Sequence, residues 1–300
     1  MFRPTRLLMP LLLALIASCG GSGAPAATDG LPTVTGEYGS KPTLAFPSVT
    51  PPSELMSTVL REGTGPVVVT GDLLVADYLG QVWKGEVFDN SYDRKKPTGF
   101  VIGSGKVIPG WDKVLVGVKA GSRVLMSLPP ADGYGAQGNA DAGIKGTDTL
   151  VFVVDVVASY GKTAAGDVAA VAQQANLLGV TVTGALGKAA AVTVAKTAVA
   201  PTTPERTILA EGTGPAVESG LLIVQYAATQ YNGTPAGDTY SSAPAAIGVG
   251  ADGGGTPFDL LVGVPLGSRV LLRLPSQGTQ LAVAIVVDLI AQPRSASVTG

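Results

Sequence analysis

The residues with the clearest chemical meaning form an apolar and aromatic set in the middle of the chain. An aliphatic pair, a Pro-Gly turn and a tryptophan follow one another at residues 107–111, in a sequence with only two tryptophans. The set comprises Tyr78, Phe88, Val107, Ile108, Trp111, Tyr134, Ile144 and Phe152. These side chains predict a cavity with few polar groups, which would bind and desolvate a ligand without attacking it.

The absence of histidine limits the chemistry that such a site can perform. The 300 residues contain no His and a single Cys. This composition excludes a Ser-His-Asp or Cys-His nucleophile, a zinc site of the usual His/Cys kind and a disulfide within the chain. We therefore expect no metal and no cofactor. The formal net charge is −2 and no block of Lys or Arg stands out, so nucleic acid is not an expected partner.

The composition and the apolar runs predict the elements that position these residues. The chain is 46% hydrophobic but only 5% aromatic, with 41 glycines and 22 prolines, which favours short strands and tight turns. Apolar runs predict strands over residues 72–79, 123–128 and 149–157. A short helix is predicted over residues 110–118, and an Ala- and Gln-rich segment predicts a linker helix over residues 164–178. The pattern favours an α+β fold.

Over roughly residues 60–157, the order and spacing of these motifs resemble the FKBP-type peptidyl-prolyl cis–trans isomerases. The resemblance implies a bent antiparallel sheet wrapped around one short helix, and isomerisation of X–Pro bonds without a covalent step. It implies that Trp111 forms the floor of the cavity. The walls would be aromatic at Tyr78, Phe88 and Phe152, and aliphatic at Val107, Ile108 and Ile144.

The same resemblance implies roles for a few polar groups. The backbone N–H of Ile108 and the hydroxyl of Tyr134 would donate hydrogen bonds to ligand carbonyls. Asp89 would be the one carboxylate facing the cavity, held by Tyr78 and Arg94, because a buried carboxylate needs such partners to stay charged. The implied partners are proline-containing polypeptide segments, and macrolide inhibitors of the family are possible ligands.

The sequence departs from the family at the rim of the cavity. Thr98 stands where many relatives have an aromatic residue after a Lys-Pro pair, and Asn139 stands where they have histidine. The loop over residues 135–148 has an extra residue and is rich in Gly and Ala. We expect these changes to alter the preference for the residue before proline and the affinity for macrolides.

The first residues of the chain indicate export and a lipid anchor. Arg3 and Arg6 precede an apolar run at residues 7–17, which is too short for an ordinary transmembrane span. Residues 16–19 resemble a bacterial lipobox, with Cys19 as the lipidated residue. The sequence thus predicts a signal peptide at 1–18, a flexible tether at 19–32 and a location on the outer face of the bacterial cytoplasmic membrane. The alternative is a plain secretory signal.

Several short motifs occur twice in the chain in the same order. The pairs are residues 33–36 and 181–184, 62–66 and 211–215, 73–78 and 221–226, and 121–125 and 267–271. A period of this length predicts two tandem FKBP-like domains and not a solenoid. The predicted domains lie at 33–160 and 181–292, with a linker at 161–180 and a tail at 293–300.

The second copy is predicted to be degenerate and without catalytic activity. It keeps a tyrosine, Tyr226, but the other site residues of the first copy are replaced. Their counterparts in our alignment are Ala236, Gly237, residues 253–257, residues 276–280 and Ile285.

The sequence therefore predicts a lipid-anchored isomerase that assists the folding of exported proteins, since uncatalysed X–Pro isomerisation is slow enough to limit folding. One alternative is a non-catalytic FKBP-like binding or chaperone module of the cell envelope. Another is a structural protein whose domains act as spacers.

Overall fold

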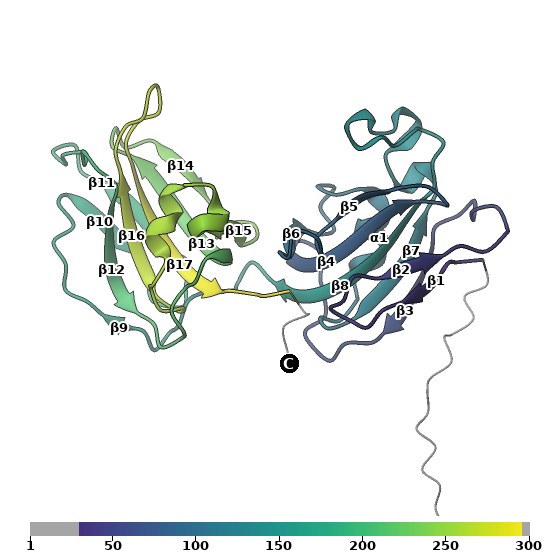
Figure 1. Cartoon of the computed structure of the whole chain (residues 1–300). Helices are drawn as coiled ribbons and strands as arrows, with labels where there is room; N and C mark the ends of the chain where they lie inside the picture. The colour runs from purple at the N-terminus through teal and green to yellow at the C-terminus, as the bar shows by residue number, and fades with distance from the viewer. Residues whose placement is uncertain (1–29, 296–300) are drawn as a thin grey trace, which may run out of the picture.

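The structure, a computed structural model, describes residues 30–295 and contains two β-rich units that lie side by side (Figure 1). We call residues 30–160 the first unit and residues 161–295 the second unit. With two mainly antiparallel sheets and one short α-helix, the chain is an α+β protein. None of the helices in this part of the chain is both long enough and apolar enough to span a membrane.

The first unit consists of a hairpin, a six-stranded sheet and the helix. The hairpin pairs β1 (Thr33–Thr35) with β2 (Thr43–Ala45). The sheet has the order β3-β7-β8-β4-β5, and β6 also pairs with β4. Its strands are β3 (Met56–Arg61), β4 (Leu73–Val82), β5 (Val87–Asn90), β6 (Thr98–Val101), β7 (Arg123–Leu128) and β8 (Leu150–Tyr160). Three one-turn 3₁₀ helices at Pro130–Asp132, Gly135–Gln137 and Ala140–Ala142 form the loop between β7 and β8.

The central strands are apolar along most of their length because both faces of the sheet are covered. On one face, Val124, Met126 and Phe152 pack with α1 (Pro109–Leu115) in the main core of the unit. On the other face, Leu125 and Val153 pack against the hairpin. The predicted strands at 72–79, 123–128 and 149–157 fall on β4, β7 and β8.

The helix α1 begins at the Pro-Gly turn and is shorter than its predicted range. Pro109 stands at the first helical position, where its missing N–H leaves no hydrogen bond unmade. A side chain at Gly110 would place its Cβ 2.4 Å from Leu128 Cδ2, so glycine permits the close approach of helix and sheet. The helix ends at Leu115, and Val116 is extended, whereas the prediction continued to residue 118.

The second unit contains a seven-stranded sheet and a second hairpin. The hairpin pairs β10 (Val180–Thr183) with β11 (Ala191–Val194). The sheet has the order β14-β13-β17-β16-β12-β9, and β15 also pairs with β13. Its strands are β9 (Val171–Ala172), β12 (Glu205–Glu211), β13 (Gly220–Gln230), β14 (Pro235–Asp238), β15 (Ala245–Val249), β16 (Arg269–Leu274) and β17 (Val283–Ala291). Two 3₁₀ helices, η4 (Gly250–Gly253) and η5 (Pro257–Leu261), follow β15.

The predicted linker helix over residues 164–178 is wrong. This segment contains no helix: it consists of turns and irregular chain, and its residues Val171 and Ala172 form β9, which pairs with β12. Val171 is well exposed, so the segment has no apolar face that a helix could bury. Pairing with the free edge of a sheet satisfies its backbone groups instead.

A buried ion pair joins two neighbouring strands in the first unit. Arg123 on β7 donates from Nε to Asp155 Oδ1 at 2.6 Å and from Nη2 to Oδ2 at 2.7 Å, and both side chains are almost fully buried. The guanidinium also donates to the carbonyl oxygens of Gly36 and Ser40, which belong to the hairpin. Tyr92 donates its hydroxyl to Asp155 at 2.9 Å. The pair thus fixes the hairpin and the loop after β5 on the sheet.

The second unit repeats the arrangement of the guanidinium, carboxylate and phenol. Arg269 on β16 donates to Asp288 on β17 at 2.7 and 2.8 Å, and Tyr240 donates its hydroxyl to the same carboxylate at 2.9 Å. The guanidinium reaches the carbonyl oxygens of Gly184 and Lys188 in the second hairpin. Burial, followed by the nearby carboxylate, raises the pKa of both Tyr92 and Tyr240, so each hydroxyl remains a donor.

The two units touch through an apolar contact between β4 and β13. Leu73 and Val75 of the first unit are buried against Leu221 and Ile223 of the second. At Gly99 on β6 an added Cβ would lie 2.5 Å from the Cβ of Ala246, which shows how closely the two sheets approach there. Burial of this aliphatic surface holds the units against each other.

We predict that Arg123→Leu lowers the free energy of unfolding of the first unit by about 3–5 kcal/mol, because it leaves the buried carboxylate of Asp155 unpaired. Urea unfolding followed by tryptophan fluorescence reports on this unit, since both tryptophans, Trp83 and Trp111, lie in it. As a control, Lys119→Ala breaks an exposed ion pair with Glu62 and should change the free energy of unfolding by less than about 1 kcal/mol. Equal effects of the two substitutions would contradict the prediction.

Candidate functional site

A cavity of about 820 Å³ opens beside α1 in the first unit. The structure brings eight of the ten predicted site residues to its wall. They are Tyr78, Phe88, Asp89, Val107, Ile108, Trp111, Tyr134 and Phe152. They come from β4, β5, the loop before α1, α1 itself, the loop after β7, and β8, so the whole fold of the unit is needed to assemble the cavity.

Trp111 lies at the base of the cavity and is held by three other rings. Its indole ring meets Tyr78 at 5.5 Å, Phe100 at 4.8 Å and Phe152 at 5.4 Å between ring centroids, each in an edge-to-face arrangement. Only 3% of its surface is exposed. Edge-to-face contacts are favourable for aromatic pairs, so the indole plane is fixed before any ligand arrives.

Gly80 on β4 makes room for the aromatic side of the cavity. Phe88 and Phe152 meet at 5.6 Å between centroids, directly over this glycine. A Cβ at residue 80 would lie 2.7 Å from Phe152 Cε1 and 2.7 Å from Phe88 Cζ. Any side chain at this position would therefore push the two rings apart, and glycine is the residue that allows them to pack.

Two carboxylates, Asp89 and Asp141, line the cavity, and both oxygens of Asp89 have fixed partners. Tyr78 donates its hydroxyl to Asp89 Oδ2, and Arg94 donates from Nη1 to Asp89 Oδ1. Arg94 also donates from Nη2 to the hydroxyl oxygen of Tyr78 at 2.9 Å. The three side chains form a closed triangle at the cavity wall, so each holds the other two in place.

The triangle fixes the protonation of its members. Partial burial alone would raise the pKa of Asp89, but the hydrogen bonds from Tyr78 and Arg94 outweigh it and keep that pKa below its usual range. Burial, and then the hydrogen bond to Asp89, raises the pKa of Tyr78 to about 12. At neutral pH Asp89 is therefore charged and Tyr78 is protonated.

Three hydrogen-bond donors at the cavity have no partner within residues 30–295. The indole Nε1 of Trp111 is buried and unpaired, and the backbone N–H of Ile108 and the hydroxyl of Tyr134 make no hydrogen bond to a described residue. Tyr134 is 37% exposed, at the rim. Donors of this kind can serve a ligand that brings carbonyl oxygens.

Two predicted site residues lie elsewhere. Arg94 does not line the cavity, although it reaches it through Asp89 and Tyr78. Ile144 is buried in the core, and its backbone exchanges two hydrogen bonds with Asn139, so it supports the cavity loop from behind. The prediction that Ile144 forms a wall is not met by this structure.

The sequence reasoning missed Phe100, whose ring lines the cavity and packs on Trp111. Its place on β6, two residues after Thr98, was a weak signal, because residues two apart on a strand point to the same face. Ala142 and Asp141, from the 3₁₀ turn of the loop, also line the cavity and carry no signal in the sequence.

Comparison with known proteins identifies the family. The family model for FKBP-type peptidyl-prolyl cis–trans isomerases matches residues 65–157. An FK506-binding protein of Streptomyces anulatus is 39% identical over 119 residues, which cover 39% of this chain and 96% of the relative. The chain belongs to the FKBP-type isomerase family.

Other FKBP relatives match about a third of the chain. An FK506-binding protein of Neisseria meningitidis serogroup A is 38% identical over 101 residues, covering 34% of this chain and 92% of the relative. Among solved structures, the crystal structure of AtFKBP13 matches with 36% identity and a TM-score of 0.33, over 36% of this chain and 94% of that one.

The FKBP family match ends before the second unit, and the structure corrects our alignment there. Asp112 accepts from the N–H of Gly103 at 2.6 Å, and Asp259 accepts from that of Gly250 at the same distance. The residue before Asp259 is Phe258, which therefore stands in the place of Trp111; the alignment of residues 253–257 with 107–111 was wrong by one residue. The second unit keeps an aromatic residue at this position.

Other parts of the FKBP site have no counterpart in the second unit. By strand register, Gly237 stands in the place of Asp89 and Ile285 in that of Phe152. The loop between the last two strands is reduced to residues 275–282, compared with residues 129–149 in the first unit. Within residues 30–295, no group of three or more His, Cys, Asp or Glu side chains is placed to hold a metal ion.

We predict that Asp89→Asn destabilises the protein at pH 7 and that its difference from the parent narrows in acid. Because the folded pKa of Asp89 is lowered, its ionised form stabilises the fold above the usual carboxyl range, and this contribution is lost as pH falls through the folded value. Urea unfolding at pH 7 and at acid pH measures the difference.

The control is Asp141→Asn, which changes another carboxylate at the cavity that forms no ion pair with a described residue. This substitution should change the free energy of unfolding only slightly, and by a similar amount at both pH values. A difference between Asp89→Asn and the parent that stays constant with pH would contradict the prediction.

Proposed function

We propose that the first unit catalyses cis–trans isomerisation of X–Pro bonds in polypeptides. The observation that carries this proposal is the cavity with Trp111 at its base, closed by aromatic rings and open to a few unpaired donors. The aromatic part of the cavity lining offers an apolar surface on which a proline ring can pack. Membership of the FKBP family, in which relatives are named peptidyl-prolyl cis–trans isomerases, supports the same activity.

The proposed mechanism lowers the barrier without bond formation. Rotation about an X–Pro bond faces a barrier of about 18–20 kcal/mol because it breaks amide resonance. Water hydrogen-bonded to the imide carbonyl favours the charge-separated planar form, so transfer into an apolar cavity removes part of that stabilisation. Tighter binding of the twisted imide than of either planar form lowers the barrier further.

The polar groups would orient the substrate and not transfer protons. The N–H of Ile108 and the hydroxyl of Tyr134 are available to donate to substrate carbonyls at the cavity rim. Asp89 is held by Tyr78 and Arg94, and its lowered pKa keeps it charged, so it fixes the cavity wall. With no histidine in the chain and Tyr78 titrating near pH 12, this mechanism is independent of pH between about 5 and 8.

We further propose that the chain contains two tandem FKBP-like domains, of which the second does not isomerise proline. Both units pair a hairpin with a sheet through the same Arg–Asp–Tyr contact. The registers of β4 with β8 and of β13 with β17 also correspond. The absence of a carboxylate at Gly237 and the short last loop in the second unit support loss of the site.

We propose that the protein is exported and held by a lipid on Cys19, where it would act on exported polypeptides. Cys19 and the apolar run before it lie outside the described residues, so this proposal rests on the sequence pattern. The short Gly-, Ser- and Ala-rich segment after Cys19 would serve as the tether.

Isomerase activity is testable on the chain from Gly20 onward, which keeps every described residue. In a protease-free assay on a proline peptide, Trp111→Leu and Asp89→Val should each lower kcat/KM by about tenfold or more, which corresponds to about 1.4 kcal/mol or more of lost transition-state stabilisation. The matched control is Trp83→Leu, since the other tryptophan packs on Phe46 away from the cavity and should leave kcat/KM within about twofold.

Inactivity of a folded parent protein would overturn the isomerase proposal. If that protein still bound the proline peptide, and Trp111→Leu abolished the binding, the cavity would be a site for holding proline segments without turnover. Circular dichroism of each variant separates loss of the site from loss of the fold.

The lipid anchor has its own test. In a bacterial host, the full chain should incorporate labelled palmitate and fractionate with membranes, whereas Cys19→Ser should do neither, because the chain has no other cysteine to carry the lipid. Equal membrane association of parent and variant would contradict the proposal.

A further inference from the structure

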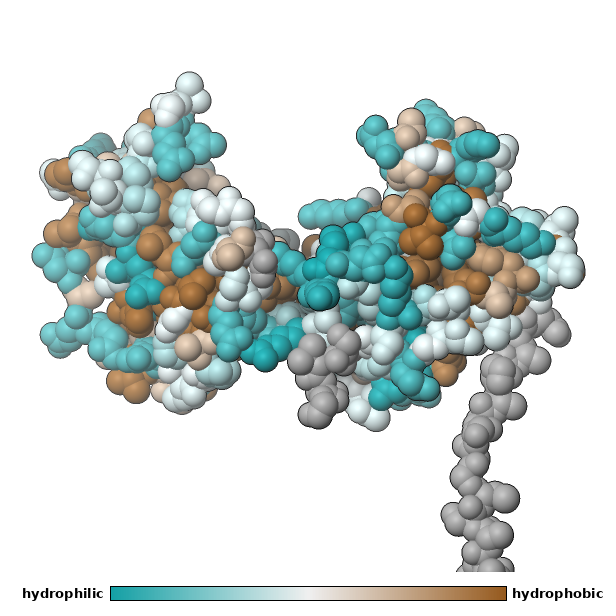
Figure 2. Space-filling model, viewed as in Figure 1, coloured by the Kyte–Doolittle hydropathy of each residue, from teal (hydrophilic) through white to brown (hydrophobic). Residues whose placement is uncertain are grey.

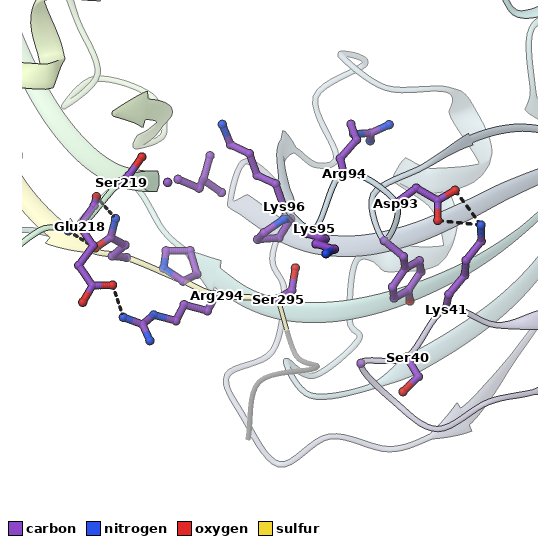
Figure 3. A pocket seen from close by; sticks show the side chains of 17 residues that line it. Ser40, Lys41, Asp93, Arg94, Lys95, Lys96, Glu218, Ser219, Arg294 and Ser295 are labelled. Carbon is purple, nitrogen blue, oxygen red and sulfur yellow. Dashed lines mark hydrogen bonds and ion pairs between the residues drawn. The ribbon is translucent and has the colours of Figure 1, made fainter. Parts of the chain in front are cut away.

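A second cavity, of about 970 Å³, lies between the two units (Figure 3). Its first wall is the loop over residues 91–97 together with the turn of the first hairpin, and its second wall is the turn before β13 together with residues 292–295. The apolar contact of β4 with β13 lies beside it, since Leu221 belongs to both. We call this cavity the cleft.

The cleft is lined by an excess of positive charge. Its basic residues are Lys41, Arg94, Lys95, Lys96 and Arg294, and its acidic residues are Asp93 and Glu218. The whole chain has a formal net charge of −2, so this local excess is opposite in sign to the protein as a whole. Figure 2 shows the corresponding hydrophilic surface on the first unit, where it faces the second.

Both acidic side chains of the cleft are already paired. Lys41 donates to Asp93 at 2.7 Å, and Arg294 donates to Glu218 at 2.6 Å, as the dashed lines of Figure 3 mark. By contrast, the ammonium group of Lys95 contacts no acid among the described residues. Arg94 is also paired, with Asp89 outside the cleft. Three of the five basic side chains are thus matched by acids, and Lys95 keeps an unneutralised positive charge in the concave wall.

The loop over residues 91–97 also borders the proposed isomerase site. Arg94 lines the cleft, and its guanidinium bonds Asp89 and Tyr78, which line the aromatic cavity. The loop over residues 91–97 therefore separates the cleft from the cavity in which we propose that a proline binds.

We propose that the cleft binds an acidic segment of a polypeptide. Carboxylate side chains complement the Lys and Arg side chains, and a volume of about 970 Å³ accommodates a short stretch of chain. A recessed site between two units favours a narrow extended chain over a flat membrane surface. This inference goes beyond the proposed isomerisation, because binding in the cleft requires no turnover.

The test measures binding of fluorescein-labelled octaglutamate to the chain from Gly20 onward by fluorescence anisotropy, with octaglutamine as the neutral probe. Octaglutamate should bind more tightly than octaglutamine, and added salt should weaken its binding. Lys95→Gln should weaken octaglutamate binding by about two- to fivefold, and Lys95→Glu should weaken it more.

The matched control is Lys188→Glu, which makes the same change of charge at an exposed residue outside the cleft and should leave the affinity unchanged. The proposal is overturned if octaglutamate does not bind, or if Lys188→Glu weakens binding as much as Lys95→Glu does. Binding to phosphatidylglycerol vesicles without binding to octaglutamate would also overturn it and assign the charge to a membrane surface.

A second readout keeps the cleft and the isomerase site distinguishable. Lys95→Glu should leave kcat/KM unchanged for a neutral proline peptide and lower it for a peptide with glutamates beside the proline. This readout rests on the proposed isomerase function, whereas the anisotropy measurement does not. If the parent protein is inactive but binds octaglutamate, and Lys95→Glu weakens that binding, the isomerase proposal is contradicted and the cleft proposal is supported.

Discussion

The buried pairing of a guanidinium with a carboxylate on adjacent strands is the contact on which both units depend. Arg123 with Asp155, and Arg269 with Asp288, each place a charge in the interior that is tolerable only when every polar atom finds a partner. The remaining guanidinium N–H groups find these partners in carbonyl oxygens of a hairpin. The ion pair therefore fixes which segment covers the outer face of the sheet, and the central strands can be apolar on both faces.

With the outer face covered, the inner face of the first unit is free to build a cavity. The polar groups around it divide into two kinds. The hydroxyl of Tyr78 and the carboxylate of Asp89 satisfy each other and Arg94, so they are rigid parts of the wall. The donors of Ile108 and Tyr134 have no described partner and remain open to a ligand. A rigid wall with a few open donors can bind one distorted form of a ligand more tightly than its relaxed forms.

Much of the first unit was predictable because its signals are local. The apolar runs of β4, β7 and β8 and the Pro-Gly start of α1 are properties of short segments, and the site motifs have a characteristic order. The linker helix was predicted wrongly because composition does not reveal that residues 171–172 lie beside the free edge of β12.

Other errors came from spacing and from three-dimensional placement. The second unit has one residue fewer than the first between Asp259 and Leu261, the counterparts of Asp112 and Leu115, so an alignment read without that gap missed Phe258. Ile144 was predicted to line the cavity but is buried behind its loop, and Phe100 lines the cavity without having been predicted. Neither placement can be read from the neighbouring residues in the sequence. The cleft between the units depends on how two sheets pack, which no motif describes.

The glycine under the aromatic pair sets a steric condition on where in a sheet such a wall can be built. In the second unit, register places Ala228 where the first unit has Gly80, opposite Ile285 in place of Phe152. A methyl group at this position blocks the same pair of rings, since a Cβ at Gly80 would lie 2.7 Å from both of them. Two phenylalanines placed at residues 236 and 285 would therefore not pack in the second unit unless Ala228 were glycine. A single methyl group thus decides whether two facing rings fit over this part of a sheet.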